Sequence, residues 1–472
     1  MDSRRFATNY AVQIGGRALT MLFGLITIGV LTRALSGSEY GEYTTALTFL
    51  QFFAVIVDFG LTLSLIVMIS EEGADEKSIV GNLFSMRMLS GALLFGLAPI
   101  AVLAFPYSAA VKQGVLIGAA GYLFMAGATM LVGVFQKHGG MWRAALAETL
   151  NRIVLLGLVV WLASTGAGLI PMIAATVVAN LVWLGATLWL ARPILRIVPR
   201  FDTDVWKDAI HRSWPIALSI AFNLIYLRGD ILFLSLFRPS ADVAVYGVAY
   251  KVLDVLTALP VMFMGLLLPT LVRDWSAGSH ETFRGHLSRA FDLFAVVTIP
   301  IAIGAQAVGT QLVELIAGDK YVASGPLLQF LILALVAVFF STLYGHAVVA
   351  VNKQRVMIFG YAAAAIVATT GYLTLIPRFG AWGAAATTLV SEILIATITF
   401  VVVRRASGAT PSLTVPLKAL ACSALMYLLL RVLPASLPVV ISVAIGAAGY
   451  FAAMIGIGGI DIKKIREITR PA

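Results

Sequence analysis

The sequence predicts an all-α integral membrane protein of about fourteen transmembrane helices. Of its 472 residues, 60% are hydrophobic and only 12% are charged, and the mean hydropathy is +0.95. Soluble domains carry roughly 25% charged residues, so a chain with half that share cannot hide its apolar surface from water. Apolar runs that can cross ~30 Å of hydrocarbon recur along the whole chain. These observations exclude a soluble enzyme.

The apolar runs form two series. The first has six runs, at 11–32, 44–69, 83–104, 115–135, 150–164 and 169–190. The second has eight, at 214–237, 243–271, 291–316, 327–351, 357–376, 381–403, 417–430 and 439–457. The first run exceeds the ~7 to 15 residues of a signal-peptide core and is interpreted as a retained span. The run that ends at Ser164 is short, and its start could lie nearer Ala144.

The positive charges predict the orientation. With a cytoplasmic N-terminus, most of the 33 Lys and Arg residues fall on the cytoplasmic side, including Arg87, Arg152 and Lys418, which are placed at span ends. The positive-inside rule favours this topology, with both termini in the cytoplasm. The net charge of +10 is therefore explained by topology. The cations are scattered between apolar runs, so no nucleic-acid partner is expected.

Two of the predicted cytoplasmic connections have amphipathic patterns. Apolar side chains recur at helical spacing from Trp275 through Phe283 and Leu287 to Phe291, between arginines. A shorter pattern surrounds Trp206. Both segments are expected to lie along the cytoplasmic interface.

A weak internal repeat suggests a duplication. Tyr40-Gly41 enters the second span as Tyr246-Gly247 enters the eighth, and a shared Ala-Ala-Thr motif begins at Ala174 and at Ala385. The predicted domains are an N-terminal six-helix lobe at 1–200, a C-terminal six-helix lobe at 201–406, and two additional helices with a basic tail at 407–472. Because six is even, the pseudo-twofold axis would run along the membrane normal, as in transporters with parallel repeats.

Several segments resemble one family of transporters. They are LTRALSGSEYGEY (31–43), DFGLTLSL (58–65), RGDILFLSLFRPSADVAVYGVAYKVLD (228–254), AGDKYVASGPLLQFL (317–331), NKQRVMIFGY (352–361) and PRFGAWGAAATTLVSE (377–392). Together they resemble the Wzx-type O-antigen or exopolysaccharide flippases of the multidrug/oligosaccharidyl-lipid/polysaccharide exporter superfamily. The order and spacing of the segments are more specific than any one of them.

The resemblance implies two six-helix lobes around a cavity that opens alternately to each side of a bacterial inner membrane. It implies a polyprenyl-pyrophosphate-linked oligosaccharide as substrate, with membrane lipids, a polysaccharide polymerase and a chain-length regulator as candidate partners. No catalytic constellation, metal-ligand spacing or ATP-binding loop occurs in the sequence, so we expect a transporter without a cofactor and not an enzyme.

Charged side chains inside spans are the candidate binding residues, because burying a charge in the bilayer costs at least ~2.5 kcal/mol. Arg17, Arg228 and Lys251 could bind the phosphates, and Arg228 and Lys251 are expected at similar depth on adjacent helices. Arg17 could instead snorkel to the cytoplasmic surface. Asn223 and Tyr226 share a helix face and could contact sugars or simply pack at a helix interface.

The acidic residues of the spans are candidates for ion coupling or charge pairing. They are Asp58, Asp230, Asp254, Glu314 and Glu392. Lys251 and Asp254 stand three residues apart and could form an ion pair. A structural network of ion pairs is therefore the competing interpretation of these charges.

Two other functions compete with a flippase. A multidrug exporter of the same superfamily would have twelve spans and acidic groups that face cationic drugs, so fourteen spans and deep cations argue against it. A membrane-embedded glycosyltransferase or polymerase would need large external loops with catalytic carboxylates, whereas the predicted external connections are short.

Overall fold

The structure of the chain, a computed structural model, describes residues 3–434 and 436–459, with no side-chain description at 3–14, 17, 18, 215, 216 and 219. No β-strand occurs in that part of the chain. Thirteen helices are long and apolar enough to cross a membrane, and the shorter segment Leu19–Ala34 is apolar as well. This confirms the predicted fold of about fourteen membrane helices. The predicted basic tail lies mostly outside the described residues.

The chain divides into two compact units, and each is described by itself. Unit 1 is Met1–Gly247 with Thr369–Ala384, and unit 2 is Val248–Ala368 with Ala385–Ala472. The first eight helices are α1 (Ser3–Ala34), α2 (Gly37–Asp58), α3 (Leu61–Ser70), α4 (Glu76–Ala101), α5 (Ala109–Lys137), α6 (Met141–Ser164), α7 (Leu169–Ala191) and α8 (Thr203–Phe237), with the short η1 (Val102–Ala104) after α4.

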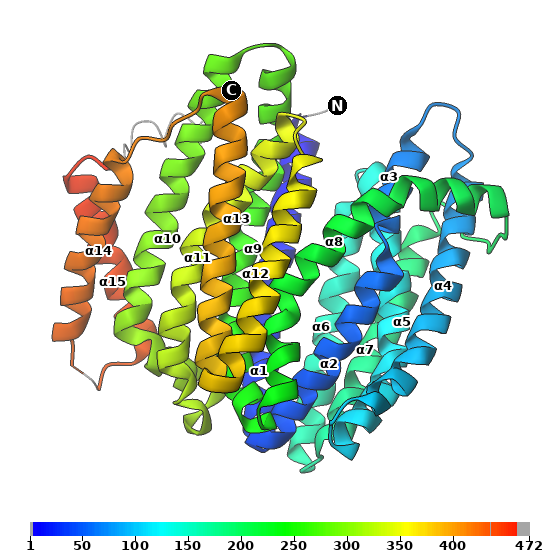
Figure 1. Cartoon of the computed structure of the whole chain (residues 1–472), viewed down its shortest axis with the longest axis horizontal. Helices are drawn as coiled ribbons and strands as arrows, with labels where there is room; N and C mark the ends of the chain where they lie inside the picture. The colour runs from blue at the N-terminus through cyan, green and yellow to red at the C-terminus, as the bar shows by residue number, and fades with distance from the viewer. Residues whose placement is uncertain (1–2, 435, 460–472) are drawn as a thin grey trace. The chain divides into compact units, whose positions relative to one another are not determined.

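The later helices are α9 (Ser240–Ser276), α10 (His280–Ala317), α11 (Ser324–Ala350), α12 (Val356–Phe379), α13 (Ala381–Ser407), α14 (Thr414–Val432) and α15 (Val439–Gly456), with the short η2 (Asp319–Tyr321) after α10. Figure 1 follows these helices in chain order. The predicted lobe boundaries at residues 200 and 406 describe a duplication and stay predictions.

Polar caps begin the first spans of unit 1. Ser36 accepts a hydrogen bond from the backbone N–H of Glu39 (3.3 Å), and the Glu39 carboxylate accepts one from the backbone N–H of Ser36 (2.9 Å). Asp75 and Ser108 cap α4 and α5 through their side-chain oxygens. These contacts satisfy amide groups that have no partner in the first turn of a helix.

The core of unit 1 lies where α3, α4 and α5 meet. Leu61, Leu65, Leu83 and Leu131 are buried there, and α4, α5 and α7 lie side by side (Figure 1). Burying such side chains contributes about 1.5–3 kcal/mol each in water, but in a bilayer the gain comes mainly from close van der Waals contact.

The start of α8 is anchored on α4. Asn82 is fully buried, its side chain accepts a hydrogen bond from the backbone N–H of Asp202 (2.6 Å), and its carbonyl accepts one from the indole of Trp206 (3.0 Å). The amphipathic pattern around Trp206 is therefore the first part of a longer helix that docks on its own unit.

The second amphipathic segment, which is expected along the cytoplasmic interface, consists of two helix ends. Residues 273–291 are not a separate interfacial helix, because they form the end of α9 and the start of α10. Phe283 and Leu287 are buried, and the Trp275 ring contacts the Phe283 ring at 5.3 Å. The apolar face of the pattern packs against protein and leaves the arginines exposed.

In unit 2 the two C-terminal helices pack on α10. Cys422 and Met426 of α14 and Tyr450 of α15 form a buried cluster with Val296. The Tyr450 hydroxyl donates a hydrogen bond to the Val296 carbonyl (2.9 Å). Figure 1 shows α14 and α15 together beside α10, so the two additional helices have their own attachment to this unit.

The two Tyr-Gly motifs mark a close helix crossing within unit 1. A Cβ atom on Gly41 of α2 would lie 1.7 Å from the carbonyl oxygen of Ser240 at the start of α9. A Cβ atom on Gly247 would lie 3.2 Å from the Thr44 side chain on α2. Each glycine therefore packs against the helix that carries the other one, and the tyrosines beside them are buried.

We predict that Gly41→Ala destabilises the protein by at least about 3 kcal/mol, because the added methyl group meets a backbone atom that must move. Gly247→Ala should cost less, since it meets a side chain. Thermal unfolding in detergent can be followed with a thiol-reactive dye, because the sole cysteine, Cys422, is buried. The control is Gly37→Ala, where a Cβ atom meets nothing within 4 Å. Equal melting points for the Gly37 and Gly41 variants would contradict the crossing.

Candidate functional site

The second membrane span is broken between the 22 residues of α2 and the 10 residues of α3, next to a candidate acidic residue. The span Gly37–Ser70 contains α2 and α3, and between them Phe59 has φ 43° and Gly60 has φ 74°. A left-handed conformation is uncommon for phenylalanine and has to be held by its surroundings. The last residue of α2 before this break is Asp58.

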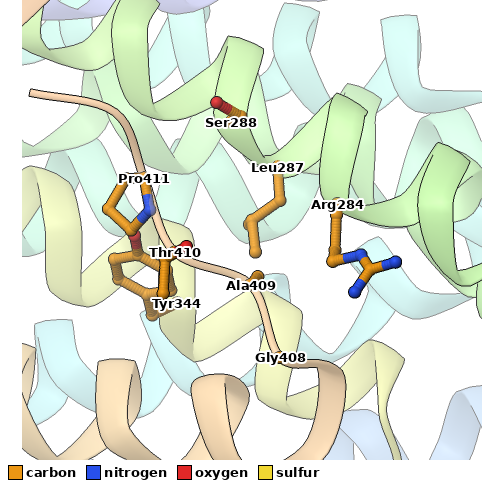
Figure 2. A pocket seen from close by; sticks show the side chains of 8 residues that line it. All are labelled: Arg284, Leu287, Ser288, Tyr344, Gly408, Ala409, Thr410 and Pro411. Atoms are coloured by element: carbon orange, nitrogen blue, oxygen red, sulfur yellow. The ribbon is translucent and has the colours of Figure 1, made fainter. Parts of the chain in front are cut away.

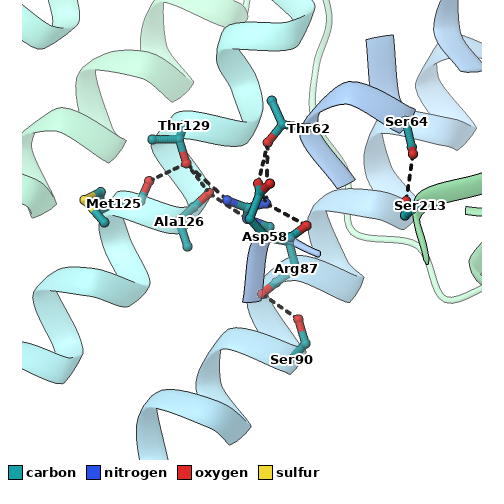
Figure 3. Close-up of polar contacts among 9 residues, drawn as sticks. All are labelled: Asp58, Thr62, Ser64, Arg87, Ser90, Met125, Ala126, Thr129 and Ser213. Atoms are coloured by element: carbon teal, nitrogen blue, oxygen red, sulfur yellow. Dashed lines mark hydrogen bonds and ion pairs between the residues drawn. The ribbon is translucent and has the colours of Figure 1, made fainter. Parts of the chain in front are cut away.

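Arg87 of α4 holds the break together. Its guanidinium forms an ion pair with the Asp58 carboxylate and donates to the Asp58 carbonyl (3.4 Å). It also donates to the carbonyl of Ala126 (3.1 Å) and to the hydroxyl of Thr129 (3.3 Å) on α5. The Thr62 hydroxyl donates to the same carboxylate (2.8 Å), so α2, α3, α4 and α5 meet at one polar knot (Figure 3).

The position of Arg87 corrects the sequence analysis. Arg87 was expected at a cytoplasmic span end, but it lies about 16 Å along α4 from Glu76 at ~1.5 Å per residue and its side chain is 4% exposed. A buried arginine this deep requires an anionic partner. Asp58, the candidate for ion coupling, is therefore placed in a charge pair.

A second polar group surrounds Asp230 on α8. The fully buried Asp230 accepts a hydrogen bond from the Tyr246 hydroxyl of α9 (2.6 Å). On the neighbouring turn, the Asn223 amide donates to the Tyr226 hydroxyl (3.1 Å), which brings the two predicted sugar contacts together. The Tyr226 carbonyl accepts from the hydroxyl of Tyr372 on α12 (2.9 Å). All five residues belong to unit 1.

Two arginines of the same unit interact with tyrosines. Arg152 of α6 interacts electrostatically with Tyr43 of α2. Tyr122 of α5 interacts with Tyr43 and with Arg228 of α8. Both guanidinium groups lie near the middle of their spans, Met141–Ser164 and Ile220–Phe237. The Arg152 Nε atom is buried and has no hydrogen-bond partner among the described residues.

Arg152 is a cation inside a span that the sequence analysis did not single out. The span that contains it was predicted at 150–164, with a start that could lie nearer Ala144, and Arg152 was counted at a span end. The helix α6 begins at Met141, directly after Gly139 (φ 64°) and Gly140. The two glycines were the signal that could have set the helix start earlier and placed Arg152 in the membrane.

Four further candidates, Lys251, Asp254, Glu314 and Glu392, lie in unit 2. Lys251 pairs with Asp254 on one face of α9 (3.6 Å), as the spacing predicted, and both side chains stay partly exposed at 44% and 21%. Glu392 is buried near the middle of α13, among the buried hydroxyls of Thr387, Thr388 and Ser391. Tyr361 of α12 interacts electrostatically with Glu392.

Glu314 and Arg17 stand apart from these groups. Glu314 is exposed in the last turn of α10, so it does not share the burial of Glu392. Arg17 belongs to α1, but its side chain lies outside the described residues. A further carboxylate, Asp292 of α10, has a buried Oδ1 atom without a partner in the described part of the chain and was not singled out from the sequence.

No group of three His, Cys, Asp or Glu side chains could hold a metal ion in the searched, described residues. The polar groups instead offer guanidinium, phenol, amide and ammonium donors within the apolar spans. Guanidinium and ammonium groups suit phosphate oxygens, and phenol and amide groups suit hydroxyl-rich ligands.

Comparison with known proteins defines the class. A family model described as "Polysaccharide biosynthesis protein" matches residues 6–275. The succinoglycan biosynthesis transport protein ExoT of Rhizobium meliloti (strain 1021) is 26% identical over 370 residues, which cover 75% of this chain and 71% of that protein. The chain belongs to the polysaccharide biosynthesis protein family, and it is a membrane transporter of the multidrug/oligosaccharidyl-lipid/polysaccharide exporter superfamily.

Solved structures agree with the fold. The lipid II flippase MurJ in an inward closed conformation superimposes with a TM-score of 0.79 and 14% identity, covering 98% of this chain and 100% of that one. An inward-facing multidrug transporter of the same superfamily gives a TM-score of 0.68 and 13% identity, covering 85% of this chain and 98% of that one. At this level of identity the likeness concerns the fold alone.

We predict that Arg87→Gln lowers the free energy of unfolding by about 3–5 kcal/mol, because Asp58 and the broken backbone lose their cationic partner inside the membrane. The loss is measured as the drop in the thermal unfolding midpoint in detergent and in the yield of folded protein.

The matched control is Arg212→Gln. Arg212 lies before the membrane span and binds Asp208 (2.9 Å) and Glu71. These two hydrogen bonds raise the pKa of Arg212, so it stays charged at every working pH. The pair is half exposed, and its loss should cost no more than about 1 kcal/mol. If the Arg87 and Arg212 variants have the same unfolding midpoint, the polar knot around Arg87 does not contribute the stability predicted for it.

Proposed function

We propose that this transporter flips a polyprenyl-pyrophosphate-linked oligosaccharide from the cytoplasmic to the outer leaflet of a bacterial inner membrane. One observation carries the proposal. A chain of the polysaccharide biosynthesis family keeps two arginines, Arg152 and Arg228, at mid-membrane depth in one unit. Such charges are retained in membranes where they have a function, and a passing phosphate group needs cations at this depth.

The chemistry of these arginines and their neighbouring tyrosines fits a pyrophosphate. A guanidinium binds two phosphate oxygens in a planar fork, and two guanidiniums can divide a pyrophosphate between them. Tyr43 and Tyr122 interact electrostatically with these arginines. The Tyr122 hydroxyl donates to the Leu47 carbonyl (2.7 Å), so Tyr43 is the one of the two that can donate to a phosphate or sugar oxygen. Among the described residues the buried Arg152 Nε atom has no hydrogen-bond partner, which is consistent with a group that a ligand satisfies.

The neighbouring polar residues fit the oligosaccharide. Asn223 and Tyr226 already share a hydrogen bond of 3.1 Å, and both carry donors and acceptors that match sugar hydroxyls. In unit 2, taken by itself, the Lys251 ammonium is 44% exposed beside Asp254 and is a separate candidate contact for a phosphate oxygen. In this proposal the site is exposed alternately to the two sides of the membrane while the polyprenyl tail stays in lipid.

Reconstitution tests the function directly. The purified protein is placed in liposomes with lipid-linked oligosaccharide, and the fraction of glycan that a lectin or glycosidase reaches from outside is followed with time. Protein-dependent transfer of the glycan supports the proposal. Export of ethidium-like cations without glycan transfer would instead favour a multidrug exporter, the alternative within the same superfamily.

We predict that Arg152→Gln and Arg228→Gln each reduce the flipping rate at least about tenfold, because one lost charge-assisted contact is worth about 1.5 kcal/mol or more. The control is Lys207→Gln, which removes a cation that is 77% exposed near the start of α8. Its flipping rate should equal that of the unmodified protein. If both arginine variants flip at the normal rate, Arg152 and Arg228 do not bind the substrate. The proposed function would then depend on other residues.

We also predict that Glu392→Gln removes the response of flipping to an imposed proton or sodium gradient. The amide keeps the shape of the buried carboxylate but can neither release a proton nor balance a cation. The measurement compares flipping with and without each gradient. The control is Glu314→Gln, because Glu314 is exposed in a terminal turn. A gradient response that survives in the Glu392 variant would assign coupling elsewhere.

A further inference from the structure

Unit 2 contains a cavity that the transport site does not use. It measures about 300 Å³ and lies between the start of α10, α11 and the linker that joins α13 to α14. Figure 2 shows Leu287 pointing toward Ala409, with Arg284 on one side and Thr410 and Tyr344 on the other. The polar groups at this cavity are the Arg284 guanidinium, the Ser288 and Thr410 hydroxyls and the Tyr344 phenol.

A second, apolar cavity continues from the first. It measures about 460 Å³, is lined by side chains of α10, α11 and α13, and shares Tyr344 and Pro411 with the polar cavity. Its aromatic wall is continuous, because the Phe291 ring lies 4.7 Å from that of Phe340 and the Tyr344 ring lies 5.2 Å from that of Phe400. The two cavities adjoin at Tyr344 and Pro411 and are together called the hollow, which has a polar end and an apolar end.

The polarity of this hollow follows the depth in the membrane. Along α10, the exposed Arg284 precedes Phe291 by about 10 Å at ~1.5 Å per residue. At the same end of the unit, α13 carries Arg404 and Arg405 in its last turn, and Phe400 lies one turn deeper. The cationic end therefore lies at the level of lipid headgroups and the aromatic end at the level of acyl chains.

The charges select the kind of headgroup. None of the eight residues around the polar cavity carries a carboxylate, and Arg284 supplies a full positive charge beside two hydroxyl groups. A guanidinium with neighbouring hydroxyls binds a phosphodiester through charge-assisted hydrogen bonds. A zwitterionic headgroup would bring its own cation to this basic end and would be disfavoured.

We propose that this hollow binds one molecule of an anionic diacyl phospholipid from the surrounding bilayer. The phosphodiester contacts Arg284, Ser288 and Thr410, and an acyl chain fills the cavity between Phe291, Phe340 and Phe400. The lipid fastens the linker between α13 and α14 to α10 and α11. The site is separate from the transported substrate, and it stands whether or not the proposed flipping activity is correct.

The first test measures stabilisation by lipids. The unfolding midpoint of the full-length protein in detergent is recorded against increasing phosphatidylglycerol, phosphatidylcholine or glycerol phosphate. We expect a saturable rise with phosphatidylglycerol only. Arg284→Gln should weaken the apparent affinity about tenfold. Arg289→Gln is the matched control, because Arg289 lies one turn further along α10 and does not line either cavity.

A second variant tests the apolar end. Ala396→Phe fills the deeper cavity that Ala396 lines, so it should abolish stabilisation by phosphatidylglycerol while the protein still folds without added lipid. Native mass spectrometry gives an independent readout. One phosphatidylglycerol molecule should remain bound to the unmodified protein and to the Arg289 variant, and it should be lost from the Arg284 and Ala396 variants.

Three results would overturn the proposal. Equal stabilisation by phosphatidylcholine would mean that the headgroup charge is not recognised. Equal stabilisation by glycerol phosphate would reduce the site to an anion pocket. Retention of a lipid-linked glycan that depends on Arg284, in place of phospholipid, would assign the hollow to the transport path.

Discussion

The absence of water inside the bilayer is the constraint on which the structure depends. A broken helix or a charged side chain at this depth must find all its partners within the protein. The break after Asp58 exists because Arg87 reaches from a neighbouring span and binds both the carboxylate and the freed carbonyl. The same guanidinium binds α5, so one side chain joins three spans. Removal of the Arg87 side chain therefore takes a partner from several polar groups at once.

Close approach of backbones supplies the rest of the cohesion. Lipid tails are as apolar as leucine, so helices gain little from burying leucine and gain more from surfaces that meet closely. Because Gly41 and Gly247 have no side chains, α2 and the start of α9 approach more closely than a Cβ atom at either position would allow. The charged residues then lie between helices whose positions are already set. Fold and site therefore rest on different residues, although both occupy the same spans.

Much of the fold could be predicted from the sequence, because hydrophobic runs of membrane length have few alternatives. The pairing of Lys251 with Asp254 followed from helical spacing alone. The depth of Arg87 and Arg152 did not, since a run of apolar residues does not reveal where its helix begins. The partner of Asp58 was also beyond sequence reasoning, because that contact joins residues far apart in the chain.

The interruption between α2 and α3 has a mechanical meaning. The segment before it is tied to the start of α9 through Gly41, and the segment after it is buried with Leu65 in the cluster that receives the start of α8. A continuous rod would carry any rotation from one leaflet to the other. A jointed rod, with Phe59 and Gly60 as the joint, lets each half follow its own neighbours.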